Sequence, residues 1–185
     1  RVARGEKAAK LTVVPLKGWK RSMTFDKTGM PWVLPSPHIP QPATAFYYPA
    51  TGILGELYYV SIGVGYTLPF QLICADWIDA DKFAERMNAL NLPGTKFRPI
   101  HVKPFYGTGK GENLQGVQFY VDDVPGSSLT LIQFYAMQEL AKLYPEKRIF
   151  DTATDKSRFD MFDKVCGTDK IRTLFSKNYQ VSDMI

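Results

Sequence analysis

The spacing of apolar and polar residues changes several times along the chain, and each spacing predicts an element. In residues 79–90, apolar side chains recur on one face at the helical period, with Asp79 as the expected N-cap. Residues 95–105 and 115–122 alternate between apolar and polar positions, which is typical of strands with one buried face. The glycine-rich segment 107–113 separates them and predicts a hairpin turn, because a phosphate-binding loop would be followed by a helix.

Further apolar segments lie on either side of this region. The run at 11–16 (LTVVPL) is rich in β-branched residues and predicts a buried strand. The longest helix is expected between Ser128 and Pro145. Near the C-terminus we expect one short strand and two small helices, at 148–150, 159–166 and 168–177. These elements predict an α/β (α+β) fold, in which helices pack on a small mixed β-sheet.

A proline-rich segment precedes the central part of the chain. Residues 28–50 contain six of the 13 prolines, a density that argues against a helix and favours extended backbone. The segment also contains aromatic and aliphatic residues, so we expect a long ordered loop that packs on the fold. Residues 52–70 mix glycine, tyrosine and aliphatic residues, and from Tyr58 to Gly65 the glycines fall at alternate positions, which predicts close backbone approach instead of a regular strand.

Composition limits the classes of protein. The chain has 185 residues, of which 45% are hydrophobic and 14% aromatic, enough for a folded core without disulfides. A disordered tail would lack these aromatic residues. No apolar run approaches the roughly 20 residues of a membrane-spanning helix. The chain begins with Arg1, which indicates that the sequence is processed or truncated.

The net charge of +5 comes from one end of the chain. Residues 1–28 carry a balance of +6, whereas the remainder carries −1. No helix-turn-helix, zinc-finger or RNA-binding pattern accompanies the basic residues, so no nucleic-acid partner is expected. The two cysteines, Cys74 and Cys166, lie in apolar surroundings and read as structural thiols. The spacing of cysteine and histidine supports no metal site, and no cofactor is expected.

Glu56 is the strongest candidate for acid–base chemistry. It is the only acidic residue between Asp26 and Asp76, and its neighbours are apolar and aromatic. A carboxyl group in such surroundings is paired, hydrogen-bonded or raised in pKa, and a raised pKa suits a general acid. The alternative interpretation is structural: the carboxylate would accept hydrogen bonds from the backbone of the glycine loop.

Other candidates surround Glu56 in the sequence. Five tyrosines, including Tyr58 and Tyr59, could stack on sugar faces or serve the core equally well. His38 lies between prolines, where a rigid loop would present one titratable group; a supporting role is the alternative. His101 shares a strand face with Lys103 and could reach a cleft.

Several segments together resemble one bacterial family, the NamZ-type exo-β-N-acetylmuramidases, first catalogued as a domain of unknown function. The segments that carry the likeness are GW-R-SM at 18–23, TGMPWVLPSPHIP at 28–40, ATAFYYPATGILGE at 43–56, S-x-G-x-G-x-T-L-PF at 61–70, FRP at 97–99 and DKVCGTDKIR at 163–172. The likeness extends from about residue 11 to the C-terminus. Its loops between Trp19 and Phe70 are the most specific part.

The resemblance implies the organisation and the function. Residues 1–28 would be the remnant of an upstream Rossmann-like domain and its junction, and 29–185 a C-terminal α/β domain with Pro-rich and Gly-rich cleft loops. The full-length protein would be a peptidoglycan-directed glycosidase of the cell envelope, periplasmic or secreted. It would bind a peptidoglycan fragment or muropeptide sugar, and the isolated chain would be inactive. Glu56 would be catalytic, and substrate would be bound by Ser36, His38, Tyr58, Tyr59, Ser61, Gly63, Gly65, His101 and Lys103.

The chain also departs from the family pattern. Many members have Glu-Gly-Thr-Asn followed by Ser-Glu-Gly-Arg-Gly-Thr, whereas this chain has apolar or aromatic residues at 57–59, 62 and 64. His38 replaces the asparagine usual in the Pro-Ser-Pro loop. A cleft that has lost charge in this way leaves open a second class of function, a non-catalytic muropeptide- or glycan-binding or interaction domain.

Overall fold

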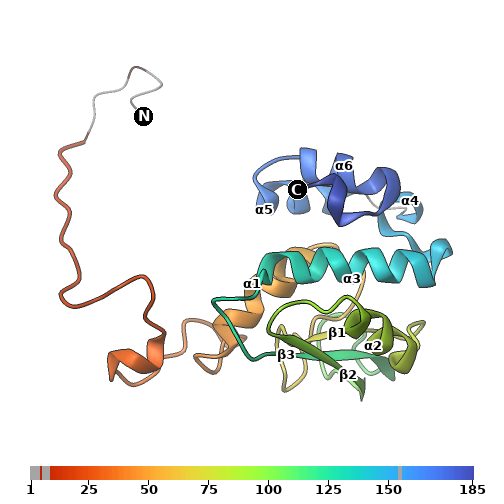
Figure 1. Cartoon of the computed structure of the whole chain (residues 1–185), viewed down its shortest axis with the longest axis horizontal. Helices are drawn as coiled ribbons and strands as arrows, with labels where there is room; N and C mark the ends of the chain where they lie inside the picture. Colours follow the sequence, from red (N-terminus) through yellow and green to blue (C-terminus); the bar gives the residue numbers. More distant parts are fainter. Residues whose placement is uncertain (1–4, 6–8, 154–155) are drawn as a thin grey trace. The chain divides into compact units, whose positions relative to one another are not determined.

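The structure, a computed structural model, describes residues 5, 9–153 and 156–185. The chain divides into two units, Arg1–Val33 and Leu34–Ile185 (Figure 1). The predicted division at residues 28 and 29, with a Rossmann-like remnant before it, stays a prediction.

The described part of the first unit is mostly extended. Its one helical element is the short 3-10 helix η2, Phe25–Thr28, after which the ring of Phe25 meets that of Trp32 edge-on. The strand predicted at 11–16 is wrong for this chain: the segment forms no strand, and Leu11 is 82% exposed. An apolar β-branched run becomes a strand only when another strand pairs with its backbone, and no described segment does so.

Three strands form the sheet of the second unit: β1 (Leu72–Ala75), β2 (Thr95–Val102) and β3 (Leu114–Val121). Their order is β1-β3-β2, and both pairings are antiparallel. The α+β class is confirmed, and the sheet is antiparallel where a mixed one is expected. The cause is local, because β2 and β3 are joined by the predicted turn, and a short connection favours an antiparallel pair.

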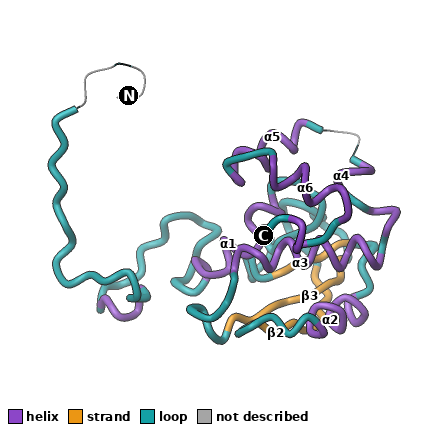
Figure 2. Tube along the Cα trace, turned by 45° about the horizontal axis from the view of Figure 1, so that its top comes forward, coloured by secondary structure: helices purple, strands orange, loops and turns teal. Residues whose placement is uncertain are grey.

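In the part of the second unit that the structure describes, six helices accompany the sheet, and Figures 1 and 2 show their arrangement. They are α1 (Thr44–Gly55), α2 (Ala80–Ala89), α3 (Leu129–Leu143), α4 (Ile149–Thr152), α5 (Ser157–Cys166) and α6 (Lys170–Asn178), with the short 3-10 helices η3 (Pro145–Lys147) and η4 (Val181–Asp183). α3 runs between the sheet with α2 on one side and α4 to α6 on the other (Figure 1). It is buried on nearly all sides, as a central helix must be.

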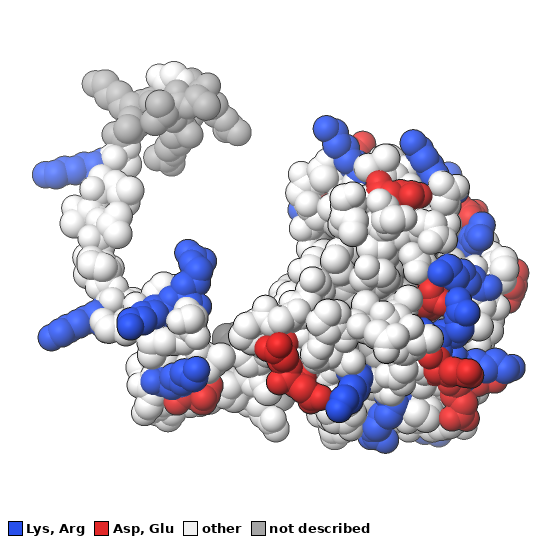
Figure 3. All heavy atoms as spheres, in the orientation of Figure 1, with Lys and Arg blue, Asp and Glu red and all other residues white. Residues whose placement is uncertain are grey.

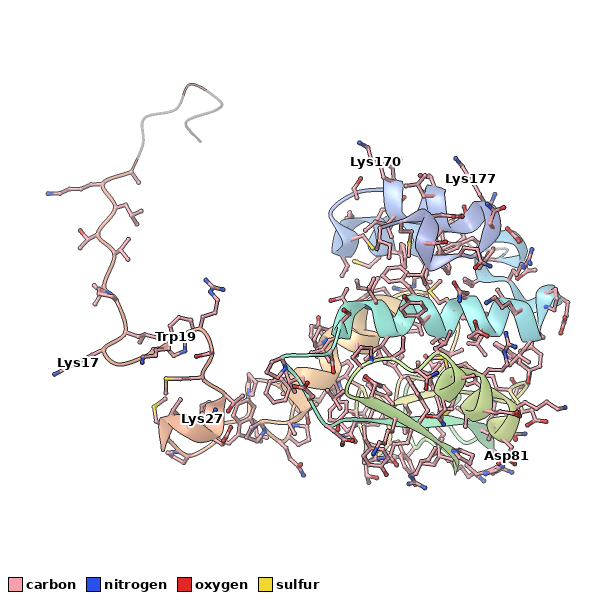
Figure 4. All side chains as sticks on the ribbon, viewed as in Figure 1. Lys17, Trp19, Lys27, Asp81, Lys170 and Lys177 are labelled. Carbon is pink, nitrogen blue, oxygen red and sulfur yellow. The ribbon has the colours of Figure 1, made fainter. Side chains whose placement is uncertain are left out.

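The main core lies where α3 meets its neighbours. Phe119 of β3, Phe83 of α2 and Phe134 of α3 belong to one apolar cluster that continues into Phe162 of α5 and Phe175 of α6. Lys170 and Lys177 of α6 point away from α3 (Figure 4), so this short helix is amphipathic in the ordinary sense.

A second, smaller apolar cluster covers the opposite face of the sheet. It is formed by Leu72, Cys74, Val102 and Leu114, with Leu68 packed against it. Because side chains of a strand alternate between its faces, Ile73 and Val117 point into the main core instead. Both faces of the sheet are therefore covered, one by helices and the other by loops.

Most of the elements predicted between residues 79 and 178 are confirmed. The Asp79 carboxylate caps α2 by accepting a hydrogen bond from the Lys82 backbone N–H. The strand predicted at 148–150 is wrong: the backbone N–H groups of Asp151 and Thr152 both donate to the Arg148 carbonyl, which closes a helical turn. An apolar run this short does not distinguish a strand from a buried helical turn.

The prediction that proline excludes a helix from residues 28–50 is also wrong, because α1 begins at Thr44 and contains Pro49. The fully buried Gln133 of α3 supports this helix from outside. Its side-chain oxygen accepts from the Leu54 N–H at 2.9 Å, and its amide nitrogen donates to the Pro49 carbonyl at 2.9 Å. Pro49 has no N–H for the Ala45 carbonyl, and Gln133 adds two hydrogen bonds elsewhere on the backbone of the same helix.

Gln133→Leu is expected to lower the free energy of unfolding by about 2–3 kcal/mol, since two buried backbone groups of α1 would each lose a hydrogen-bond partner. Denaturant unfolding followed by circular dichroism measures the change. Gln41→Leu, at an exposed position before α1, serves as the control. Equal stability of the two variants would show that Gln133 does not support the helix.

Candidate functional site

A cleft of about 360 Å³ opens beside the C-terminal end of α1, within the second unit. Its volume lies in the range of small-molecule sites. The proline-rich loop, α1, the segment after it and the glycine-rich turn all contribute to its walls. The lining residues are His38, Tyr48, Gly52, Gly55, Glu56, Tyr58, Val60, Ile62, Val64, Phe70, Gly107 and Thr108.

Glu56 follows α1 directly and is the one carboxylate among the lining residues of the cleft. It is half-buried, so the expectation of a buried acid is wrong: its apolar sequence neighbours point partly elsewhere. Within the described part of the chain its carboxylate forms neither an ion pair nor a hydrogen bond, so the alternative interpretation, in which it bonds the backbone of the glycine loop, finds no support there. A carboxylate at the C-terminal end of a helix opposes the helix dipole, so fold stability does not explain its position.

His38 lines the cleft from the proline-rich loop. Its ring Nδ1 and the Tyr106 hydroxyl share a hydrogen bond of 2.9 Å. The Ser36 hydroxyl accepts a hydrogen bond from the backbone N–H of His38, which shapes the loop before the histidine. Ser36 supports the loop and does not line the cleft. The arrangement fixes the orientation of the imidazole and leaves its other nitrogen for a different partner.

Residues 60–65 alternate in direction. The predicted binding residues Ser61, Gly63 and Gly65 do not line the cleft, whereas Val60, Ile62 and Val64, which are not predicted, do. The backbone of Ser61 instead pairs with Cys74 of β1 in both directions. This wall of the cleft is therefore apolar.

Gly65 does not line the cleft; its backbone lies against the backbone of the loop that contains Tyr106. Its φ is 95°, and its carbonyl accepts a hydrogen bond from the Phe105 N–H at 2.9 Å. A Cβ at this position would overlap the carbonyl oxygen of Tyr106. The predicted close backbone approach is confirmed, and it holds the loop of Tyr106 against the segment that lines the cleft.

The tyrosines are divided between the cleft and the core. Tyr48 and Tyr58 line the cleft and are about half exposed. Tyr59 packs against Trp77 with ring centroids 5.3 Å apart, and burial raises the pKa of its hydroxyl. Tyr47 meets Phe119 of the core. Only Tyr48 and Tyr58 are placed to stack on a bound ring.

His101 and Lys103 lie in a different place from the other predicted residues. With Tyr66, Asn113 and Gln115 they line a second, open hollow of about 470 Å³, where β2 ends and β3 begins. The structure thus brings together Glu56, His38 and Tyr58, and places His101 and Lys103 elsewhere.

The site also contains three residues that the sequence does not indicate: Tyr106, Gly107 and Thr108. The sequence around them predicts only a hairpin turn. Gly107 and Thr108 line the cleft, and Tyr106 bonds His38. The one sequence signal that pointed to them is the pair of aromatic residues before the glycine-rich turn. A turn of this kind becomes part of a site only through its tertiary contact with the proline-rich loop.

Metal and thiol chemistry find no support in the described residues. These residues contain no group of three or more side chains suited to hold a metal ion. Cys74 and Cys166 are free, and burial raises the pKa of their thiols to about 12 and about 11. Both thiols are protonated at neutral pH and are therefore poor nucleophiles.

Charge is mixed over the folded unit, where acidic and basic side chains lie side by side in Figure 3. None of the described helices is both long and apolar enough to cross a membrane.

Comparisons with known proteins identify the relatives of the chain. Residues 46–185 match the family described as "Exo-beta-N-acetylmuramidase NamZ, C-terminal", and residues 1–43 match its N-terminal counterpart. The chain is 38% identical over 177 residues to the peptidoglycan beta-N-acetylmuramidase NamZ of Bacillus subtilis (strain 168), covering 96% of this chain and 41% of that protein.

A solved structure gives the same result. The crystal structure of a DUF1343 family protein from Bacteroides fragilis is 55% identical and superimposes with a TM-score of 0.88, covering 91% of this chain and 44% of that one. The chain spans about two fifths of the length of these relatives. The resemblance inferred from the loop motifs is confirmed: the chain belongs to the NamZ exo-β-N-acetylmuramidase family.

Proposed function

We propose that the full-length protein cleaves terminal N-acetylmuramic acid from peptidoglycan, and that this chain forms one wall of its sugar-binding cleft. The observation that carries the proposal is the Glu56 carboxylate, which lines an aromatic-edged cleft and has no partner among the described residues. A chain 38% identical to a peptidoglycan beta-N-acetylmuramidase makes a glycoside the natural occupant.

Glycoside hydrolysis usually requires two carboxyl groups on opposite sides of the scissile bond. Glu56 supplies one, and the described lining of the cleft contains no other. We place the second on the N-terminal Rossmann-like domain of the full-length protein. The isolated chain would then bind sugar without cleaving it.

Each neighbour of Glu56 has a role in this proposal. Tyr48 stacks on the apolar face of the sugar ring, since amphipathic aromatics suit a carbohydrate surface, and Tyr58 borders the same cleft. His38, oriented by Tyr106, hydrogen-bonds a sugar hydroxyl. The apolar wall of Val60, Ile62 and Val64 excludes water beside the glycosidic bond, which strengthens the interactions of the carboxyl group.

The substrate determines where the protein acts. Peptidoglycan lies in the bacterial cell wall, so we propose a location in the cell envelope, periplasmic or secreted. No cofactor takes part in the proposed reaction, because proton transfer and water suffice for glycoside hydrolysis.

A chromogenic β-glycoside of N-acetylmuramic acid tests the proposal. Full-length protein is expected to release the chromophore, whereas the same glycoside of N-acetylglucosamine is expected to be a poor substrate. Binding of N-acetylmuramic acid without any release would overturn the proposed hydrolysis in favour of a glycan-binding role. Absence of both would overturn the assignment of the cleft to sugar.

A further inference from the structure

Arg158 lies at the edge of the cleft, in the first turn of α5 (Ser157–Cys166). Its guanidinium carbon is 3.8 Å from the centre of the Tyr58 ring, so the cation rests on the ring. Tyr58 itself lines the cleft, and α5 contacts α1, whose C-terminal end bears Glu56. The stack therefore places the positive charge of Arg158 beside the cleft that is also lined by Glu56, the carboxylate without a partner among the described residues.

Three other arginines of the unit use their N–H groups within the protein, whereas Arg148 stacks on Tyr179 and its buried Nε has no partner among the described residues. Arg86 donates to the Glu139 carboxylate, Arg98 to Gln118 and Arg172 to Asp163. Arg158 differs from these three, because among the described residues its only interaction is with the face of Tyr58. Stacking occupies the face of a guanidinium and leaves the donors at its edge free for an anion.

Helix stability does not explain the position of Arg158. A cation in the first turn of a helix opposes the helix dipole, which favours negative charge there. The backbone conformation of Tyr58 is also unfavourable, because its φ of 51° lies in the left-handed region that a bulky residue rarely adopts. Its side chain is 56% exposed. Two residues held in unfavourable positions against each other, at the edge of a cleft, indicate a binding role.

We propose that Arg158, held on Tyr58, binds the carboxylate of an acidic sugar and thereby determines substrate specificity at this cleft. The inference rests on the proposed function and names the substrate group. The lactyl ether of N-acetylmuramic acid carries such a carboxylate, and N-acetylglucosamine does not. The planar edge of a guanidinium matches the two oxygens of a carboxylate, whereas a lysine would present a single point charge.

The test compares an acidic substrate with its neutral methyl ester, both assayed with full-length protein. KM and kcat are measured on the chromogenic N-acetylmuramic acid glycoside and on its lactyl methyl ester, for wild type, Arg158→Gln and Arg158→Lys. Arg158→Gln is expected to raise KM for the acid by about 10-fold or more, with kcat nearly unchanged, because a charge-assisted hydrogen bond is lost. KM for the ester should be the same in both proteins, and Arg158→Lys should rescue part of the loss.

Lys164→Gln, which removes an exposed charge from the same helix, is the matched control and should leave both substrates unaffected. An equal KM change for acid and ester in Arg158→Gln, or none for either, would overturn the proposal. A muropeptide tests the other source of a carboxylate, the peptide stem, whose attachment converts the lactyl group to an amide. Loss confined to the muropeptide would show that the lactyl group is the wrong occupant.

The proposal and the proposed hydrolysis can fail separately. If wild type cleaves neither glycoside, hydrolysis is wrong, and calorimetry with free N-acetylmuramic acid then tests Arg158 alone. Weaker binding by Arg158→Gln than by Lys164→Gln would support the carboxylate site. Equal binding by the two variants would overturn it.

Discussion

Glu56→Gln is expected to lower kcat on the N-acetylmuramic acid glycoside by about 100-fold or more, which is the usual contribution of a general acid or base. Glutamine preserves the shape and the hydrogen-bonding oxygen of the side chain but can neither give nor take the proton. KM should change little, because the sugar is held by other groups of the cleft. Steady-state kinetics on full-length protein measures both.

Stability separates this effect from a structural one. Glu56 has no partner among the described residues and opposes the dipole of α1, so Glu56→Gln should unfold at the same temperature or slightly above wild type. Glu112→Gln, at an exposed position in the glycine-rich turn, is the matched control for a lost carboxylate. Undiminished turnover in Glu56→Gln would remove this residue from the chemistry.

Local signals explain which elements the sequence predicts. The helix after Asp79 is specified by a cap, an apolar stripe and a terminating Asn-Leu-Pro-Gly segment, all within a few residues of one another. α1 is missed because its sequence contains Pro49 and follows other prolines, whereas part of the support of its backbone comes from Gln133, which lies more than 80 residues further along the chain. β1 is missed for the related reason that four buried residues carry no period by themselves.

The candidate site shows the same limit. The sequence identifies Glu56, His38 and Tyr58, which share one cleft, from isolated polarity and rigid loops. It does not separate Ser61 from Ile62, because the irregular segment turns one set of side chains to the cleft and the other to β1. The residues next to Arg158 in the sequence do not indicate a role for it; only its contact with the Tyr58 ring does.

Glu139 of α3 is a buried carboxylate that accepts hydrogen bonds from three side chains. Its side chain is 1% exposed; Arg86 donates to one oxygen at 2.6 Å, and Lys142 to the other at 2.7 Å. Gln138 adds a third donor. Burial acts to raise the pKa of Glu139, but the hydrogen bonds from Lys142, Gln138 and Arg86 outweigh it and hold the pKa below the ordinary value of 4.5.

A lowered pKa in the folded state makes stability depend on pH in one direction. The unfolded chain takes up a proton on Glu139 near its ordinary pKa of 4.5, while the folded state still resists protonation. The stabilisation by this carboxylate is therefore complete well above pH 4.5 and is lost as the pH falls through the folded-state pKa.

Glu139→Gln is expected to lower the free energy of unfolding at pH 7 by about 2–4 kcal/mol, since Arg86 and Lys142 lose their buried anion. The loss stays at the lower end of the usual range because both cations are partly exposed and can turn to water. Denaturant unfolding at pH 7 and at pH 4 measures it, with Glu85→Gln, an exposed neighbour of Arg86, as the control. The variant should also lose less stability than wild type between the two pH values; an identical loss would mean that Glu139 is not the group that titrates.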